Sequence, residues 1–361
     1  MLGGGFLRNI IIIVGKLFFI LKHRKLSEKP IKKILIIRSG GIGDVLMSTP
    51  LVATIKKHYP DANITYMVGN WSKNVLENNP NVNTIYSYDD LDIIHFRLSR
   101  IRKIIKDMKK EKFDLAFCLE KSWHWSLLTF MFKAKRRIGF DRYGEGFANN
   151  LNVPFKGEKY ELEYYLDLAR KISLKPVSEK IEIHLTKKEK DFSEFFLYNM
   201  NLDKKKLIGI APGGADNPAQ QASIKRWPLK KYVELIKALP DYHFLLFGGK
   251  NDIETCKSID MNTKNSTFLA GKLTLKESAS LIDQCKYFIT HDSGPMHLAS
   301  ATGTKLIALF GPTQSKRFAP KNAIVINAGT PPCYTIYGLF KPVKENQMDE
   351  IKIEDVLKEI K

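Results

Sequence analysis

The sequence predicts an α/β protein built from two doubly wound domains. Short apolar runs alternate with helical stretches over most of the 361 residues, which is typical of a parallel sheet covered by helices on both faces. The alternation pauses once, around residues 186–206, and then begins again. Glycine-rich turns follow several apolar runs, where open α/β sheets bind ligands. We therefore expect two such sheets, with a ligand cleft between the domains.

The first domain is expected to span residues 31–185. Its apolar runs are rich in the β-branched and aromatic residues that favour strands, and the stretches between them show helical spacing. In the basic helix at 98–110, for example, Ile101, Ile104 and Met108 share one face. The predicted strands are 34–38, 64–68, 84–88, 115–119 and 137–140, and the predicted helices are 45–58, 71–78, 98–110, 122–133 and 160–172.

The second domain is expected to span residues 207–345, after a linker region at 186–206 that contains a charged helix at 187–198. The last segment, 346–361, is expected to form a closing helix at 353–360. The same patterns assign the remaining elements. The predicted strands are 207–211, 244–247, 267–269, 287–290 and 306–310, and the predicted helices are 229–238, 252–259, 275–284 and a short helix that ends before residue 303.

An anion site is predicted where the strand at 287–290 leads into a helix. The turn HDSG at 291–294 supplies capping side chains, and Pro295 follows in the first helical turn, where its missing N–H costs nothing. Gly303 is a suitable left-handed terminator for the helix. A helix that begins in this way offers N–H groups and the positive end of its dipole, which favour a phosphate. His297 adds a donor beside that end.

The composition favours anionic partners in a reducing compartment. The net charge is +20, from 58 basic and 38 acidic residues, while 44% of the residues are hydrophobic, as in a folded protein. No helix-turn-helix, zinc finger or stacking platform accompanies the charge, so nucleic acid is not an expected partner. The four cysteines are far apart and show no metal spacing, which predicts reduced thiols and a cytosolic protein.

Residues 1–30 are predicted to form an amphipathic, basic segment that associates with a membrane. The apolar run at 6–21 is interrupted by Arg8, Asn9 and Lys16, and no small-residue cleavage site follows it. A basic cluster comes next, which suits a helix lying in the interface of an anionic membrane. A helix packed on the protein's own surface and a single N-terminal anchor are the alternatives. The cluster comprises Lys22, Arg24, Lys25, Lys29, Lys32 and Lys33.

The glycine turn after the first strand presents one carboxylate toward the expected cleft. Leu46 stands where a dinucleotide fingerprint needs its third glycine, and no Gly-Lys-Ser/Thr follows, so neither a dinucleotide site nor a Walker loop is indicated. Asp44 is then either a functional carboxylate or a helix cap, and the sequence leaves both open. The turn reads Ser39, Gly40, Gly41, Ile42, Gly43 and Asp44.

Two further turns belong to the second domain. Gly213 and Gly214 end its first strand, and the run KRWP at 225–228 follows. Its two cations, Lys225 and Arg226, near a glycine loop would suit a diphosphate. The alternative is a solvated basic loop with its tryptophan packed on a helix. Gly248 precedes Asp252, which either meets a ribose hydroxyl or caps the next helix.

An aromatic pair brackets a histidine just beyond the strand at 115–119. Trp123 and Trp125 flank His124, and such a pair can stack on a sugar ring, although alternating aromatic residues more often belong to a core.

With these residues in hand, the chain resembles glycosyltransferase family 9, the heptosyltransferases of lipopolysaccharide core assembly. The block at 31–68 and the more specific block HDSGPMHLASATGTKLIALFGPT at 291–313 carry the resemblance, supported by the strings APGG, KRWP and LFGG. Lys250 departs from the Glu that some members carry, with Asp252 two residues later. The apolar N-terminal segment is extra to the core pattern of the family.

The resemblance implies a GT-B fold of two Rossmann-like domains and an inverting, metal-free transfer from a nucleotide sugar, commonly ADP-heptose, without a cofactor. The first domain takes the acceptor, a lipid-linked anionic glycan, and the second takes the donor. Asp44 falls on the family's general base and Lys225 on its cation. The turn Ser39, Gly40, Gly41 and Gly43 borders the acceptor. The donor set that follows from the motifs is Gly213, Gly214, Lys225, Gly248, Asp252, Asp292, Ser293, Gly294, Pro295 and His297.

Three functions follow from this interpretation. The first is a heptosyltransferase that acts at an anionic membrane surface, on the cytoplasmic face of the inner membrane, either peripherally or through an N-terminal anchor. The second is a transferase of the same fold that uses another nucleotide sugar for a cell-surface polysaccharide. The third is a non-catalytic protein that binds a glycan or lipid.

Overall fold

The computed structural model describes residues 5–20, 30–214, 223–335, 341 and 346–360. Contacts divide the chain into two compact units. The first comprises Met1–Gly40, Met47–Gly157 and Glu161–Lys180, and the second comprises Gly41–Leu46, Glu158–Tyr160 and Ile181–Lys361. Each unit contains one six-stranded sheet, and all strand pairs in both sheets are parallel.

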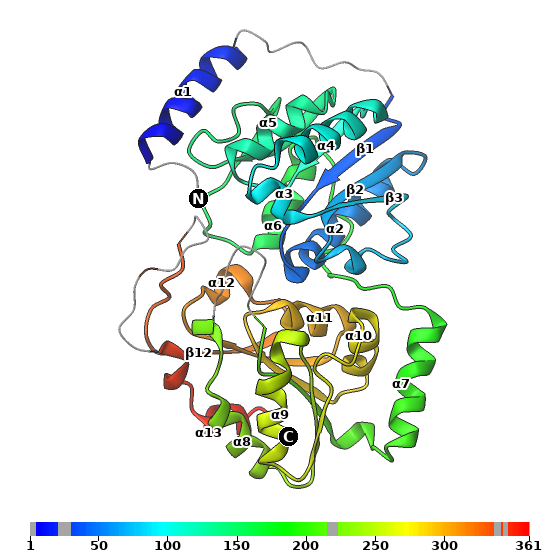
Figure 1. Cartoon of the computed structure of the whole chain (residues 1–361), viewed down its shortest axis with the longest axis vertical. Helices are drawn as coiled ribbons and strands as arrows, with labels where there is room; N and C mark the ends of the chain where they lie inside the picture. The colour runs from blue at the N-terminus through cyan, green and yellow to red at the C-terminus, as the bar shows by residue number, and fades with distance from the viewer. Residues whose placement is uncertain (1–4, 21–29, 215–222, 336–340, 342–345, 361) are drawn as a thin grey trace. The chain divides into compact units, whose positions relative to one another are not determined.

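The first sheet has the strand order β3-β2-β1-β4-β5-β6 (Figure 1). Its central strand β1 pairs Ile34 with Ile64 on one side and with Leu115 on the other, and all three side chains are buried. Such continuous burial explains the unbroken apolar runs of the sequence. The strands are β1 Lys33–Ile37, β2 Asn63–Gly69, β3 Thr84–Tyr88, β4 Leu115–Cys118, β5 Arg136–Asp141 and β6 Leu151–Pro154.

Helices connect these strands, and their apolar faces close a core over the sheet. Ile104 and Met108 of the amphipathic helix α4 are buried in this core, as the helical spacing predicts. The helices are α2 Ile42–His58, α3 Asp90–Ile94, α4 Leu98–Glu111, α5 Trp123–Met131 and α6 Glu161–Arg170.

The second sheet has the order β12-β11-β10-β7-β8-β9. In this sheet β10 pairs with β7 and β11, and its side chains are all buried. The strands are β7 Leu207–Ala211, β8 His243–Leu246, β9 Ser266–Phe268, β10 Tyr287–His291, β11 Lys305–Phe310 and β12 Ala323–Asn327. The helices are α7 Lys187–Asn199, α8 Leu229–Lys237, α9 Ile253–Met261, α10 Leu275–Asp283, α11 Gly294–Thr302, α12 Ser315–Phe318 and α13 Ile353–Leu357.

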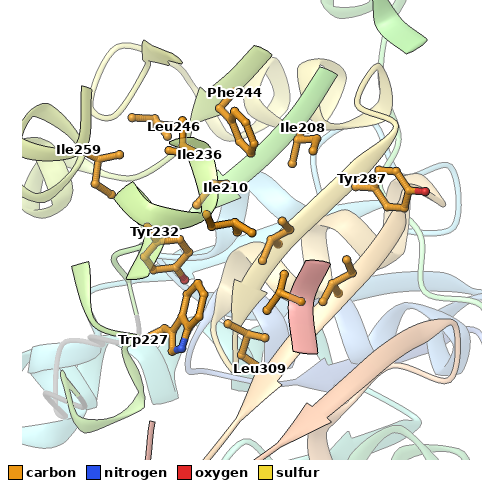
Figure 2. Packing of buried hydrophobic residues seen from close by; sticks show 14 of the residues in the cluster. Ile208, Ile210, Trp227, Tyr232, Ile236, Phe244, Leu246, Ile259, Tyr287 and Leu309 are labelled. Atoms are coloured by element: carbon orange, nitrogen blue, oxygen red, sulfur yellow. The ribbon is translucent and has the colours of Figure 1, made fainter. Parts of the chain in front are cut away.

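The core of the second unit includes the tryptophan of the KRWP run. Figure 2 shows Trp227 beside Tyr232, and their rings meet edge to face with centroids 4.9 Å apart. The indole Nε1 donates a hydrogen bond of 3.0 Å to the carbonyl of Ile351, just before α13. Through this packing the run at 225–228 is held against α8 and the C-terminal segment, so the backbone at Lys225 has a defined position.

Two elements of the first unit differ from the sequence predictions. The helix predicted at 71–78 is only a 3₁₀ turn, Lys73–Val75, because the stretch is rich in turn-forming Asn and Ser and ends with Asn78 in the left-handed conformation (φ 62°). β6 was not predicted, because four residues that end in Pro154 carry a weak strand signal.

The second unit differs in comparable places. Strand β12 was not predicted; it is an edge strand whose residues are partly buried or exposed. The helix expected at 187–198 is present, and the hydroxyl of Ser280 in α10 donates to the carbonyl of Glu189 in this helix. The closing helix is shorter than expected and ends at Leu357.

The N-terminal helix α1, Gly5–Ile20, packs on the first unit. Ile12 and Phe19 are buried against a cluster that includes Phe130 of α5 and Phe147. Packing on the protein's own surface, one of the sequence alternatives, therefore describes one face of this helix. None of the described helices is long and apolar enough to cross a membrane. The predicted basic residues Lys22, Arg24, Lys25 and Lys29 lie outside the described residues.

Candidate functional site

Both sheets have the strand order of a doubly wound fold, with the first strand beside the fourth. Chain connections leave this point in opposite directions, and open α/β sheets bind ligands there, beyond the carboxyl ends of the strands. In the second sheet this point lies between β7 and β10, and in the first it lies between β1 and β4. The site residues predicted from the sequence gather at these two places.

The helix that begins after β10 has the geometry predicted for an anion site. Ser293 is the N-cap residue of α11 with extended backbone, Pro295 lies in the first turn, and Gly303 ends the helix in the left-handed conformation (φ 87°). The Ser293 hydroxyl donates 3.1 Å to the carbonyl of His291 instead of capping the helix. Among the described residues, none accepts a hydrogen bond from the N–H of Ser293 or Gly294. These N–H groups and the helix dipole are available to an anion.

Lys225 is held beside this helix start by an ion pair. Its Nζ lies 2.9 Å from Oδ2 of Asp292, and both side chains are largely buried. Burial alone raises the pKa of Asp292, but the charge and the hydrogen bond of Lys225 outweigh it, so the pKa lies below the usual value. The carboxylate of Asp292 is therefore ionised at neutral pH. The ammonium of Lys225 also lies 5.8 Å from the ring centroid of Tyr334.

Arg226 has a different role from its neighbour. Its Nε and one of its terminal nitrogens donate 3.0 Å and 2.9 Å to the carbonyl of Gly214, so this guanidinium fixes the glycine turn. From the sequence, Lys225 and Arg226 were both expected to bind a diphosphate beside the glycine turn. The structure gives Lys225 the position beside α11 and gives Arg226 the support of the loop.

Asp252 ties together the glycine turns that follow β7 and β8. Its Oδ1 accepts 2.7 Å from the N–H of Gly214, and its Oδ2 accepts 2.8 Å from the N–H of Gly249. The side chain is 7% exposed, so these bonds are shielded from water. Asp252 is the N-cap residue of α9, but its side chain makes no capping bond to that helix, so the helix-cap alternative of the sequence is not what the structure shows. The ribose contact remains a prediction.

Gly213 is required beside this carboxylate, because a Cβ at Gly213 would lie 2.1 Å from Oδ1 of Asp252. Gly213→Ala should displace Asp252 and weaken its bonds to the backbone. We expect the free energy of unfolding to fall by about 3 kcal/mol in urea denaturation, since hydrogen bonds to charged groups contribute about 1.5–3 kcal/mol each. Gly249→Ala is the matched control, because its Cβ would lie 3.8 Å from Oδ2 of the same side chain. Equal stability of the two variants would contradict this account.

Two buried histidines accompany the site. Burial, and then the charge of Lys225, lower the pKa of His291 to about 3, against the opposing charge of Asp292. Burial also lowers the pKa of His297, again against the charge of Asp292. Both imidazoles are therefore neutral at physiological pH, so Lys225 rather than His297 supplies the positive charge at the start of α11.

The first sheet carries polar groups that the sequence did not reveal. Glu120 follows β4, and its Oε1 accepts 2.6 Å from Arg38 and 2.8 Å from both the N–H and the hydroxyl of Ser39. Arg38 also donates 3.0 Å to the hydroxyl of Tyr165. The signal that was available is an acidic residue directly after a buried strand, but its partners Arg38 and Ser39 are 82 and 81 positions away in the sequence.

Asp44 lies in the first turn of α2. Its Oδ2 accepts a long hydrogen bond of 3.3 Å from the N–H of Gly41, so the carboxylate caps the helix weakly. The sequence left a cap and a functional carboxylate open, and this bond is compatible with both, because a carboxylate has further lone pairs.

Asp90 was also missed by the sequence analysis. It follows β3, and its carboxyl lies so close to Gly69 that a Cβ there would be 2.1 Å from it. Burial and then the charge of Glu120 raise the pKa of Asp90 to about 6. A carboxyl with this pKa at the carboxyl edge of a sheet is a candidate binding group for an acceptor.

The aromatic pair around His124 has one member in the core. Trp125 is buried and its ring lies 6.1 Å from that of Tyr88, so it is a core residue. Trp123 packs beside the cluster that seats α1, and His124 stays half-buried with its Nε2 3.2 Å from the hydroxyl of Ser122. The core alternative therefore holds for Trp125, while Trp123 is only partly buried against a neighbouring cluster.

The predicted residues thus fall into two groups. In the second sheet the structure brings Lys225 to Asp292, the Gly213–Gly214 turn to Asp252, and Gly214 to Ser293, where a Cβ on the glycine would lie 3.6 Å from that of the serine. In the first sheet Ser39 joins Glu120. Among the described residues, no cluster of three or more His, Cys, Asp or Glu is arranged to hold a metal ion.

Comparisons with known proteins point to one family. The family model of glycosyltransferase family 9 (heptosyltransferase) matches residues 101–335. Lipopolysaccharide heptosyltransferase 2 of Escherichia coli strain K12 is 31% identical over 311 residues, which cover 80% of this chain and 85% of that protein.

Solved structures show the fold. A glycosyltransferase family 9 protein from Veillonella parvula DSM 2008 has a TM-score of 0.79 at 22% identity, covering 92% of this chain and 97% of that one. ADP-heptose lps heptosyltransferase II from E. coli has a TM-score of 0.69 at 26% identity, covering 91% and 97%. The expected GT-B fold and the expected family are both confirmed.

Proposed function

Since the chain belongs to glycosyltransferase family 9, we propose that it transfers heptose from ADP-heptose to a lipid-linked lipopolysaccharide core. The observation that carries the proposal is Lys225, held 2.9 Å from Asp292 at the start of α11 and beside the switch point of the second sheet. A fixed ammonium, a helix N-terminus and a glycine turn together suit the diphosphate of a nucleotide sugar. The sugar and nucleotide follow from the relatives' names, lipopolysaccharide heptosyltransferase 2 and ADP-heptose lps heptosyltransferase II.

The proposed reaction is a direct displacement that inverts the anomeric carbon. An acceptor hydroxyl attacks this carbon, a new C–O bond forms, and the bond to the diphosphate breaks. Asp44 takes the proton of the hydroxyl as general base. The electron pair of the broken bond leaves with ADP.

Charge that develops on the diphosphate must be stabilised within the site. We assign this role to Lys225 and to the N–H groups of Ser293 and Gly294, which are fixed before the substrate arrives. Such preorganised donors typically contribute about 3–4 kcal/mol each to the transition state. In this mechanism they take the part that a metal ion plays in other transferases.

The donor nucleotide is tested by thermal denaturation with ADP, UDP and GDP. A ligand at about a hundred times its Kd stabilises the folded state by about 2.7 kcal/mol, so ADP should raise Tm clearly and the other two should not. Stabilisation by UDP or GDP instead would favour a transferase for another nucleotide sugar, an alternative motivated by Lys250 near the end of β8. No stabilisation by any of them would favour a non-catalytic glycan- or lipid-binding protein.

The acceptor class implies a place of action. A lipid-linked core is built on a membrane, and the positive charge of the chain suits an anionic surface. We propose that the protein works peripherally at the cytoplasmic face of the inner membrane.

A further inference from the structure

Helix α1 has two different faces. One face rests on the first unit, where Phe19 meets the ring of Phe130 with centroids 4.8 Å apart and Ile12 is buried. Gly15 lies so close to Phe147 that a Cβ there would be 2.7 Å from the ring. The helix is therefore seated closely on α5 and the loop at 142–148, beside which Figure 1 shows it.

The seat also contains a buried ion pair. Arg8 donates 3.0 Å to Oε1 of Glu145, whose side chain is 3% exposed. Arg142 binds the other oxygen of Glu145 at 2.6 Å. Glu145 thus binds one guanidinium from α1, that of Arg8, and one from its own loop, that of Arg142. Because a buried carboxylate is costly to leave unpaired, this contact fixes the rotation of α1 about the helix axis.

The opposite face of α1 is a continuous apolar stripe. Its members recur at the spacing of one helical face and are between 41% and 62% exposed. Soluble proteins rarely expose such a run of large apolar side chains without a partner. We call this set the α1 stripe; it consists of Ile10, Ile13, Val14, Leu17 and Phe18.

Charge indicates which partner covers the stripe. Lys16 on the same helix is exposed, and Lys133, three residues after Phe130 of the seat, is also exposed. In the sequence, Lys22, Arg24, Lys25 and Lys29 follow the helix directly. A second copy of this chain, with a net charge of +20, would bring like charges together, whereas an anionic lipid surface complements them.

A tyrosine borders the seat as well. Tyr143 is 68% exposed, and the adjacent Gly144 lies beside Lys16, whose Nζ would be 2.7 Å from a Cβ at that glycine. Tyrosine and lysine together are typical of the depth where a protein meets lipid headgroups.

We propose that α1 is a membrane-docking helix that lies flat on an anionic bilayer, with the α1 stripe in the lipid interface and the opposite face on α5. Because the seat is close-packed and ion-paired, the helix does not act as a flexible tether. It fixes the orientation of the first unit relative to the membrane. The inference deepens the proposed function, since it rests on the lipid-linked acceptor that we assign there.

The test is sedimentation of the full chain with vesicles of phosphatidylglycerol and phosphatidylethanolamine, compared with phosphatidylcholine alone. The variant Ile13→Gln/Leu17→Gln keeps helix-forming residues at two exposed positions, so its fold should survive. We expect its apparent affinity for anionic vesicles to fall about tenfold or more, from the lost apolar burial. Binding of the wild type should be weaker to phosphatidylcholine and should fall with salt.

Phe195→Gln/Met261→Gln is the matched control, because these side chains are 65% and 77% exposed on helices of the second unit. It should bind vesicles like the wild type. Equal binding by the stripe variant, or wild-type dimers that the stripe variant abolishes, would overturn the proposal.

Transfer to a delipidated, soluble core acceptor separates the two proposals. The stripe variant should retain wild-type turnover with this acceptor. If no sugar is transferred by either protein, the proposed function fails, while the vesicle result still decides the role of α1.

Discussion

Replacing Lys225 with alanine is expected to reduce kcat for sugar transfer by about 10²–10³-fold, the usual loss for one preorganised donor to a developing anion. The ammonium is held beside the start of α11 by its 2.9 Å bond to Asp292. Its removal leaves the leaving diphosphate without this stabilisation. Steady-state transfer of heptose from ADP-heptose gives the measurement.

The ion pair requires a second variant, because Lys225→Ala leaves the buried carboxylate of Asp292 without its partner. Breaking a buried pair typically destabilises a protein by about 3–5 kcal/mol. Lys225→Ala/Asp292→Asn removes both charges and should recover much of the stability but not the activity. Recovery of activity in this double variant would show that the lysine acts only structurally. Lys230→Ala, at an exposed position on α8, should behave like the wild type.

The second large effect is expected for Asp44→Asn, which should lower turnover by about 10²–10⁴-fold, as for loss of a general base. The amide keeps the shape of the side chain and its contact with the N–H of Gly41, but it cannot take the proton of the acceptor hydroxyl. The rise in Tm with ADP should stay unchanged, because the donor site lies in other residues. The experiment combines kinetics with thermal denaturation.

Asp61→Asn serves as the control for this variant, since Asp61 is an exposed carboxylate beyond the other end of α2. Near-normal turnover of Asp44→Asn would contradict the assignment of the base. Loss of the ADP effect together with activity would indicate damage to the fold rather than to the chemistry.

Much of the fold could be predicted because buried parallel strands leave a strong mark in a sequence. The buried run at β7 was predicted with the observed bounds, and so was the edge strand β3, whose β-branched and aromatic residues end at a polar turn. The edge strand β6 was missed because it is short and ends in Pro154, which leaves a weak strand signal. The edge strand β12 was missed although its run AIVIN is apolar and β-branched, so its sequence does carry a strand signal. α1 was predicted as a helix, but its seat on Phe147 depends on a contact distant in sequence.

The site could be predicted only in part. The helix start at Ser293 follows from local turn chemistry, and the structure confirms it. Glu120 and Asp90 were missed, because their relation to Arg38 and Gly69 arises from the strand order of the sheet. The role of Asp252 was ambiguous for a related reason. An acidic residue before a helix can cap that helix or bind Gly214, which is 38 positions away, and the sequence alone does not distinguish the two.

The ion pair between Lys225 and Asp292 has a consequence for product release. In the proposed mechanism the Asp292 carboxylate and an incoming diphosphate compete for the same ammonium, so part of the binding energy of the nucleotide would be used to displace an internal anion. When ADP departs, Asp292 takes its place at once, and the buried lysine is never left unpaired. In this mechanism Asp292 would compete with the ADP product for Lys225, which would weaken product inhibition.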